Sequence, residues 1–248
     1  MKEHFTIVIP AFNCEAWVSR NLSSVINQNY DEYDIVYIDD HSTDGTASIV
    51  EEYIENNSLI RGKFEFKINP FNKGKMENLY NVIHSLRDDT IVVILDGDDW
   101  LYNSNVLSKL NEVYESSKIW MTNGSYVVEP TGEVVNPKIN SHYWAGSIRS
   151  KTWEFSHLGT FRKQLFCNIK RKDLMNKTGE FWSTTGDQAM MWPMAEMSGP
   201  AHFKAIGEVL YVYNRLNPLS DDRVNRTDQL MTEQTIRSLK PYQRLASL

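Results

Sequence analysis

Ile91-Val92-Val93-Ile94-Leu95-Asp96-Gly97-Asp98-Asp99-Trp100 is the stretch that decides the fold of this chain. Its five consecutive apolar residues predict a strand buried on both faces, as found in parallel α/β sheets. Three carboxylates follow at once, at the strand end where such sheets bind ligands. Mg²⁺ and Mn²⁺ prefer oxygen ligands and are often held by one or two carboxylates together with substrate phosphates. The stretch therefore predicts a metal–phosphate site, and a solvated acidic turn is the alternative.

The composition is that of a soluble globular protein with one large domain. The chain has 248 residues, of which 41% are apolar and 23% charged. A net charge of −6 gives no general attraction to nucleic acid. Two cysteines, Cys14 and Cys167, are too few and too far apart for a disulfide scaffold or a cysteine-rich zinc site. No apolar run has the length of a signal peptide core or a membrane span, so a cytoplasmic location is expected.

The first half of the chain alternates strand and helix patterns. Apolar runs predict strands at 6–9, 34–38, 64–68 and 91–95. Apolar residues at helical spacing predict helices at 15–28, 46–56, 75–86 and around 106–113. Strands separated by helices of this length imply βαβ units and a mostly parallel sheet.

The pattern changes after residue 118. Strands are predicted at 119–122, 125–129 and 209–213, and a helix at 186–197. Residues 136–160 are polar, aromatic and aperiodic, which favours a long loop that contacts substrate. From Asn225 onward the sequence predicts a charged amphipathic helix or tail, which is expected to pack on the domain rather than bind a membrane.

Polar residues follow each of the first four predicted strands. Asn13 follows the first, Asp39 and Asp40 the second, Asn72-Lys73-Gly74 the third, and the acidic triplet the fourth. In an open parallel sheet these four ends line one crevice. Carboxylates there can accept hydrogen bonds from ribose or a base, while a metal and Lys73 can face phosphates. Neither GxGxxG nor GxxxxGK[ST] occurs, so no dinucleotide-binding fingerprint or P-loop is supported.

Four motifs in this order carry a family resemblance. They are Thr6-Ile7-Val8-Ile9-Pro10-Ala11-Phe12-Asn13, Ile38-Asp39-Asp40-His41-Ser42-Thr43-Asp44-Gly45-Thr46, Asn72-Lys73-Gly74 and Leu95-Asp96-Gly97-Asp98-Asp99. Over about residues 4–215 the chain resembles family 2 glycosyltransferases, which use nucleotide-sugar donors. The resemblance implies an α/β GT-A (Rossmann-like) fold: a mostly parallel central sheet, helices on both faces and a mixed C-terminal acceptor half. A single domain, 1–248, would then comprise a nucleotide-sugar-binding half (1–117), an acceptor and catalytic half (118–224) and a C-terminal helix or tail (225–248).

The resemblance also implies roles for individual residues. Nucleotide-sugar contacts fall on the polar residues and backbone at the strand ends: Pro10, Ala11, Phe12, Asn13, Asp39, Asp40, Asn72, Lys73, Gly74, Asp96, Gly97 and Asp98. Asp96 and Asp98 would form the DxD element, which reaches the ribose and the metal-bound diphosphate. Mn²⁺ or Mg²⁺ is the implied cofactor, with Asp98 and Asp99 as ligands. Asp187, in Thr184-Thr185-Gly186-Asp187-Gln188, is the implied general base, and a helix cap is its alternative role.

One family motif is altered. Members often carry Tyr-Arg-x-His late in the chain, whereas this chain has Tyr213-Asn214-Arg215-Leu216-Asn217-Pro218-Leu219-Ser220, with Asn214 and Leu216 at the Arg and His positions. His157 is a substitute metal ligand, or else a structural histidine. Arg162 and Arg215 either offset diphosphate charge or form surface ion pairs. Trp144, Trp153 and Trp182 either stack on an acceptor sugar or pack in the interior.

The predicted function is metal-dependent, inverting transfer of a sugar, with a UDP-sugar as favoured donor. The acceptor would be a glycan, a lipid-linked molecule or a protein, and peripheral association with a membrane stays open. A nucleotidyltransferase and a catalytically inactive nucleotide-sugar-binding protein are the alternatives. A calcium-binding EF-hand loop, suggested by Asp40, Ser42, Asp44 and Gly45, is disfavoured because a strand precedes it where a helix is required.

Overall fold

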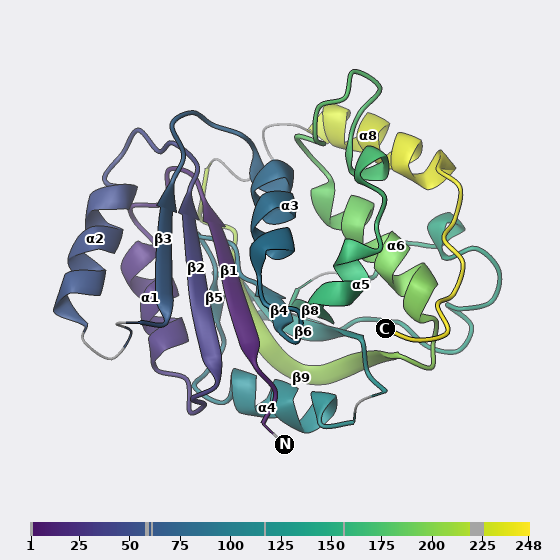
Figure 1. Cartoon of the computed structure of the whole chain (residues 1–248), viewed down its shortest axis with the longest axis horizontal. Coiled ribbons are helices and arrows are strands. Elements are labelled where there is room, and N and C mark those ends of the chain that lie inside the picture. The colour runs from purple at the N-terminus through teal and green to yellow at the C-terminus, as the bar shows by residue number, and fades with distance from the viewer. Residues whose placement is uncertain (1, 58–59, 61, 117, 156, 219–225) are drawn as a thin grey trace.

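The strand predicted from the opening stretch, β4 (Ile91–Ile94), lies in the middle of a nine-stranded sheet. The computed structural model describes residues 2–57, 60, 62–116, 118–155, 157–218 and 226–248. Within these residues the strand order is β3-β2-β1-β4-β8-β6-β9-β5, and β7 pairs with β6 outside this path. Figure 1 shows the sheet running through the molecule with helices on both sides.

The first half confirms the predicted parallel arrangement. Strands β1 (Phe5–Ala11), β2 (Tyr33–Asp39), β3 (Phe64–Ile68) and β4 pair in parallel. They are connected by helices α1 (Val18–Ile26), α2 (Thr46–Asn56) and α3 (Lys75–Ser85). The first strand was predicted to end at residue 9, yet Pro10 pairs with Ile38 and the strand continues to Ala11.

Alternation along the central strands builds a core on each face of the sheet, because successive side chains point to opposite faces. On β1, Ile7 and Ile9 pack with α1 and α4, whereas Val8 packs with α3 and α6. All three side chains are fully buried. Strand β4 alternates in the same way, with Val92 in one core and Val93 in the other, so the acidic residues that follow it are carried by an element fixed from both sides.

The second half is mixed. It contains β5 (Trp100–Leu101), α4 (Val106–Tyr114), β6 (Met121–Glu129), β7 (Glu133–Val135), β8 (Gly159–Arg162), α5 (Lys163–Cys167), α6 (Gly186–Ser198), β9 (Phe203–Asn214), α8 (Arg226–Ser238) and two short 3₁₀ turns at Ile148–Ser150 and Arg171–Leu174. Strand β8 is antiparallel to β4 and β6, whereas β6 and β9 run parallel.

Three boundaries of the second half differ from the prediction. The two strands expected at 119–122 and 125–129 are one strand, β6, because its register with β9 shifts around Ser125 without breaking the pairing. Strand β9 begins at Phe203 rather than at 209. The predicted loop 136–160 ends in β8, which gains its strand character from pairing on both sides rather than from local periodicity.

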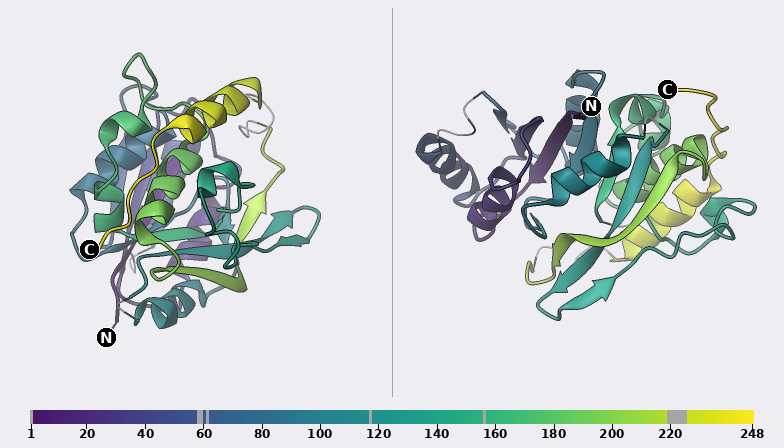
Figure 2. Two further views of the ribbon diagram at one scale, coloured as in Figure 1. Left: turned by 90° about the vertical axis from the view of Figure 1, so that its right-hand side faces the viewer. Right: turned by 90° about the horizontal axis from the view of Figure 1, so that it is seen from below.

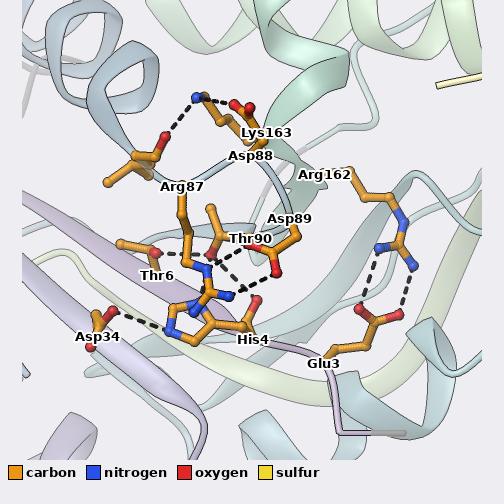
Figure 3. A network of polar contacts seen from close by, with 11 residues as sticks. Glu3, His4, Thr6, Asp34, Arg87, Asp88, Asp89, Thr90, Arg162 and Lys163 are labelled. Atoms are coloured by element: carbon orange, nitrogen blue, oxygen red, sulfur yellow. Dashed lines mark hydrogen bonds and ion pairs between the residues drawn. The ribbon is translucent and has the colours of Figure 1, made fainter.

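A polar network at the amino ends of the strands ties the two halves together (Figure 3). Arg162 on β8 forms an ion pair with Glu3 at 2.8 Å, and Lys163 donates to the Leu86 carbonyl at 2.6 Å and to Asp88 at 2.7 Å. Arg162 therefore lies at the end of the sheet opposite the acidic triplet, so it is a structural ion pair and does not offset diphosphate charge.

The C-terminal region packs on the domain, as expected. Helix α8 contacts α6, and the following segment runs back along α6, where the Leu245 amide donates to the Met197 carbonyl at 3.0 Å. Figure 2 shows α8 and this segment on the outer side of α6. The predicted starting residue, Asn225, lies outside the described residues. No helix in the described ranges is both long and apolar enough to cross a membrane.

Candidate active site

A cavity of about 460 Å³ lies at the carboxyl ends of β1, β2 and β4, between the two halves of the chain. The first half lines it with Pro10, Ala11, Phe12, Cys14, Asp40, Lys75, Met76, Asn78, Leu79, Asp96, Gly97, Asp98 and Asp99. The second half adds Trp153, His157, Trp182, Ser183, Thr184, Thr185, Gly186, Asp187, Gln188, Tyr213 and Asn217, and α8 adds Gln229 and Glu233. The fold therefore brings ten of the predicted site residues around one space.

The first acid of the triplet has a lysine partner that the sequence did not reveal. Lys75 Nζ lies 2.5 Å from Asp96 Oδ1. Burial opposes both charges, but their mutual attraction prevails: the pKa of Lys75 is raised and that of Asp96 lowered. Lys75 directly follows the Asn72-Lys73-Gly74 motif as the first residue of α3. Its place at the start of a helix facing the crevice was the available signal.

The other two acids are fixed by the end of β9. The Asn214 amide donates to Asp99 Oδ1 at 2.7 Å, Tyr211 donates to Asp99 Oδ2 at 2.5 Å, and Asn217 donates to Asp98 Oδ2 at 2.8 Å. Burial, together with the neighbouring carboxylates, raises the pKa values of Asp98 and Asp99. Asn214, which stands at the family's Arg position, thus positions the acidic turn.

Potential metal ligands gather beside this turn. Ligand atoms of Asp96, Asp99 and His157 all lie within 4.8 Å of one another, and Asp98 lines the same cavity. The His157 ring stacks on Tyr211, with ring centroids 4.5 Å apart. Burial lowers the pKa of His157 to about 4, so at neutral pH it carries the neutral imidazole that binds metals. Carboxylate ligands suit Mg²⁺ and Mn²⁺, and imidazole is a common metal ligand.

Among the residues predicted to contact the nucleotide, Pro10, Ala11, Phe12 and Asp40 line the cavity, and several others lie behind its wall. Asp40 lines the cavity and accepts hydrogen bonds from the amides of Lys73 at 2.9 Å and Gly74 at 2.8 Å. Asp39 is buried and accepts from the Ser42 amide at 3.2 Å. The Asn13 side chain accepts from the Thr43 amide at 2.8 Å.

Asn13, Asp39, Asn72, Lys73 and Gly74 thus lie next to the cavity without lining it. The hydrogen bonds above connect the ends of β1, β2 and β3 into one frame. Asp40 couples the 72–74 loop to the cavity wall, so this loop and the wall are positioned together.

Asp187 approaches the acidic cluster from the other half of the chain. It is the second residue of α6, and Thr185 occupies the N-cap position, so Asp187 is not the cap itself. The side chain is open to solvent through the cavity, yet the surrounding protein raises its pKa, while the charge of Lys75 opposes that rise. A Cβ at Gly186 would lie 2.8 Å from Met76 Cε, which shows how closely α6 approaches α3 here.

Two of the three predicted tryptophans, Trp153 and Trp182, line this cavity. Trp144 instead lines a smaller cavity of about 170 Å³ beside the C-terminal segment. The Arg215 amide donates to the Glu129 carbonyl at 2.9 Å, which extends the β6–β9 pairing.

The fold and the cavity define an α/β protein with an acidic cleft at the carboxyl ends of a central sheet. The profile of glycosyl transferase family 2 matches residues 6–177, and the chain belongs to this family. Curated relatives include a GalNAc(5)-diNAcBac-PP-undecaprenol beta-1,3-glucosyltransferase of Campylobacter jejuni, 25% identical over 75% of this chain, and the chondroitin synthase of Escherichia coli, 26% identical over 83%. This chain spans 58% of the first relative and 28% of the second.

Solved structures show the same GT-A fold. S. aureus TarS 1-349 in complex with UDP-GlcNAc superposes with a TM-score of 0.68 at 18% identity, covering 94% of this chain and 65% of that one. The mannosyltransferase PcManGT from Pyrobaculum calidifontis, in complex with GDP-Man and Mn²⁺, gives a TM-score of 0.66 at 20% identity, covering 98% and 66%. The predicted fold class is confirmed.

Proposed function

We propose that this protein is a metal-dependent, inverting glycosyltransferase that moves a sugar from a nucleotide-sugar donor to a glycan, lipid-linked or protein acceptor. One observation carries the proposal: Asp187 and the acidic triplet come from opposite halves of the chain and line the same cavity. One side of the cavity can thus hold a donor diphosphate, and the other can activate an acceptor hydroxyl.

The donor occupies the side built by the first half. Asp40 and the backbone of Pro10, Ala11 and Phe12 contact the nucleoside, with Asp39, Asn13 and the 72–74 loop holding them in place, and Asp96 contacts the ribose. Lys75 supplies positive charge next to the diphosphate. Support comes from the structural relatives, whose complexes contain UDP-GlcNAc or GDP-Man. We favour a UDP-sugar for this chain.

The residues of the cleft fit a divalent cation, Mn²⁺ or Mg²⁺. Asp98 and Asp99 would hold it, with His157 and Asp96 beside them, because closely spaced carboxylates that repel one another are stabilised by a shared cation. A bound cation would offset, as a Lewis acid, the charge that grows on the leaving phosphate. The PcManGT structure contains Mn²⁺.

Asp187 is the proposed general base. It takes the proton of an acceptor hydroxyl while that oxygen bonds to the anomeric carbon, and the bond from this carbon to the diphosphate oxygen breaks. Nucleoside diphosphate leaves with the bonding electrons, and the anomeric configuration inverts because attack and departure occur on opposite faces. The raised pKa of Asp187 suits a base, and such catalysis contributes about 10²–10⁴-fold. We propose that the reaction takes place in the cytoplasm, at a membrane surface where the acceptor is lipid-linked.

The test screens UDP-, GDP- and dTDP-sugars by thermal shift, with and without Mn²⁺, since a ligand that binds only the folded state raises the melting temperature. We expect one nucleotide sugar to give a metal-dependent shift that Asp98→Ala loses and Asp187→Asn keeps, and Asp187→Asn to abolish turnover. Asp31→Asn, whose side chain is 83% exposed, is the matched control. Binding without transfer in the wild type would indicate an inactive binder, and the absence of any shift would contradict the proposal.

A further inference from the structure

Helix α8 forms one wall of the cavity, on the side away from the nucleotide motifs. Gln229 and Glu233 of α8 line the cavity, and the Thr185 hydroxyl donates to the Gln229 carbonyl at 3.3 Å. Ile236 is buried, and the Arg149 guanidinium donates to its carbonyl at 2.7 Å. Helix α8 is thereby fixed against the element that carries Asp187.

The wall carries polar side chains, Gln188 and Glu233, that can form hydrogen bonds with the hydroxyl groups of a ligand. Arg237 holds one oxygen of Glu233 at 2.7 Å, and the other oxygen faces Gln188 Nε2 at 3.3 Å. Gln188 is buried next to Asp187, and its Oε1 has no hydrogen-bond partner among the described residues. A buried acceptor without a partner is costly, and Gln188 lines the cavity, so a rotation of its amide that brings Oε1 to a ligand hydroxyl would stabilise it.

Two aromatic side chains complete the wall. Trp182 lies at the cavity with its ring fixed by a hydrogen bond from Nε1 to the Asp173 carbonyl at 3.3 Å. Trp153 packs edge-on against the buried Trp192, with ring centroids 5.1 Å apart. Aromatic side chains that line a cavity suit a ligand with an apolar face and a polar rim.

The charge of the wall further restricts the ligand. Asp187 and Glu233 are both acidic, and Lys75, on the donor side, is the single Lys or Arg among the residues that line the cavity within the described ranges. The charge of Arg237 is directed at Glu233. Since Glu233 is neutralised by Arg237, an anionic group on the acceptor would meet the like charge of Asp187 at this wall, with no Lys or Arg among the described lining residues of the second half to balance it.

Resting on the proposed glycosyltransferase function, we infer that the acceptor is an uncharged saccharide, bound by Trp182, Gln188 and Glu233. Its pyranose ring stacks on Trp182, and its hydroxyl groups hydrogen-bond to Gln188 and Glu233. This places a further hydroxyl of the same sugar toward Asp187. Trp182 and Gln188 are thus acceptor-specificity residues, and they make no donor contact.

The test uses saturation-transfer NMR to detect glycoside binding and a titration to measure its affinity. The ligands are methyl β-D-glucoside, methyl β-D-galactoside and methyl N-acetyl-β-D-glucosaminide. Each is measured with and without the nucleotide that gives the largest thermal shift. We expect at least one glycoside to bind, and Trp182→Ala and Gln188→Leu each to weaken it about 3- to 10-fold. Trp144→Ala and Gln164→Leu are the matched controls and should bind as the wild type does. Nucleotide-sugar affinity should be unchanged in all four variants.

The outcomes separate this inference from the function on which it rests. If the donor binds but no glycoside does, or if Trp182→Ala and Trp144→Ala bind a glycoside equally well, the saccharide assignment is wrong while the glycosyltransferase proposal stands. Tighter binding of glucose 6-phosphate than of methyl β-D-glucoside would refute the uncharged acceptor. If no nucleotide sugar binds, the proposed function fails. The glycoside titration without nucleotide then still shows whether the residues of this wall bind a saccharide.

Discussion

Gly97, between Asp96 and Asp98, leaves no room for a side chain. A Cβ at this position would lie 2.6 Å from Ala11 Cβ, 3.0 Å from Ala11 Cα and 3.2 Å from the Pro10 carbonyl oxygen. Carbon atoms in contact normally lie about 3.5–4.0 Å apart, so the overlap is close to 1 Å. The Gly97 amide also donates to the Pro10 carbonyl at 3.1 Å, and the contacted atoms belong to β1, a buried central strand. Gly97→Ala must therefore push the acidic turn away from β1.

Overpacking of this kind costs about 1–3 kcal/mol of unfolding free energy. For a chain of this size a loss of about 2 kcal/mol lowers the melting temperature by about 4–8 °C. Since Asp96 and Asp98 flank the substituted residue, the same displacement should weaken nucleotide-sugar affinity by about 10-fold or more. Thermal unfolding and a donor titration measure the two effects.

Gly207→Ala is the matched control, because a Cβ there would meet nothing within 4 Å. The double variant Ala11→Gly/Gly97→Ala removes the shortest contact and should recover part of the loss, as a coupling of about 0.5–3 kcal/mol between neighbouring sites. The steric reasoning is refuted if Gly97→Ala melts at the same temperature as Gly207→Ala and binds the donor equally well.

Three further predictions follow from the cleft. Because desolvation by the surrounding protein raises the pKa of Asp187, kcat/KM should fall as the pH drops through that raised value, when the base takes up a proton. An acid limb at the ordinary aspartate pKa of about 3.9 would contradict this role. Lys75→Met should weaken nucleotide-sugar binding about 10-fold or more, since Asp96 loses its partner and the carboxylates repel each other and the diphosphate; Lys2→Met, which removes an exposed Lys–Asp pair, is the control, and equal affinities of the two variants would count against this role. EDTA should abolish transfer and Mn²⁺ or Mg²⁺ restore it, and an undiminished rate in EDTA would exclude the proposed metal.

Much of the first half followed from local sequence. The apolar runs at β1, β2, β3 and β4 and the helical spacing between them predicted a parallel sheet, and these strands do pair in parallel. Once those strands are parallel, their carboxyl ends lie at one edge of the sheet, so the sequence alone places Asp40, Asp96 and Asp98 at one crevice. The spacing of apolar residues is a local property, and this is why the sequence sufficed.

The second half depended on contacts between distant residues. Strands β5 and β8 are short and have little pattern of their own, and pairing with β9, β4 and β6 makes them strands. The reach of β9 to the acidic turn likewise appears only once the sheet is assembled, where Asn214 meets Asp99 across 115 sequence positions.

The sequence by itself determined the family, the sheet of the first half and the acids that follow its strands. The tertiary structure alone decided that Lys75 pairs with Asp96, that Asp187 lines the cavity with them, and that α8 forms the opposite wall. The physical reason is that strand and helix formation depend on the periodicity of neighbouring residues. Which charges share a cavity, by contrast, depends on packing between segments that lie far apart in the chain.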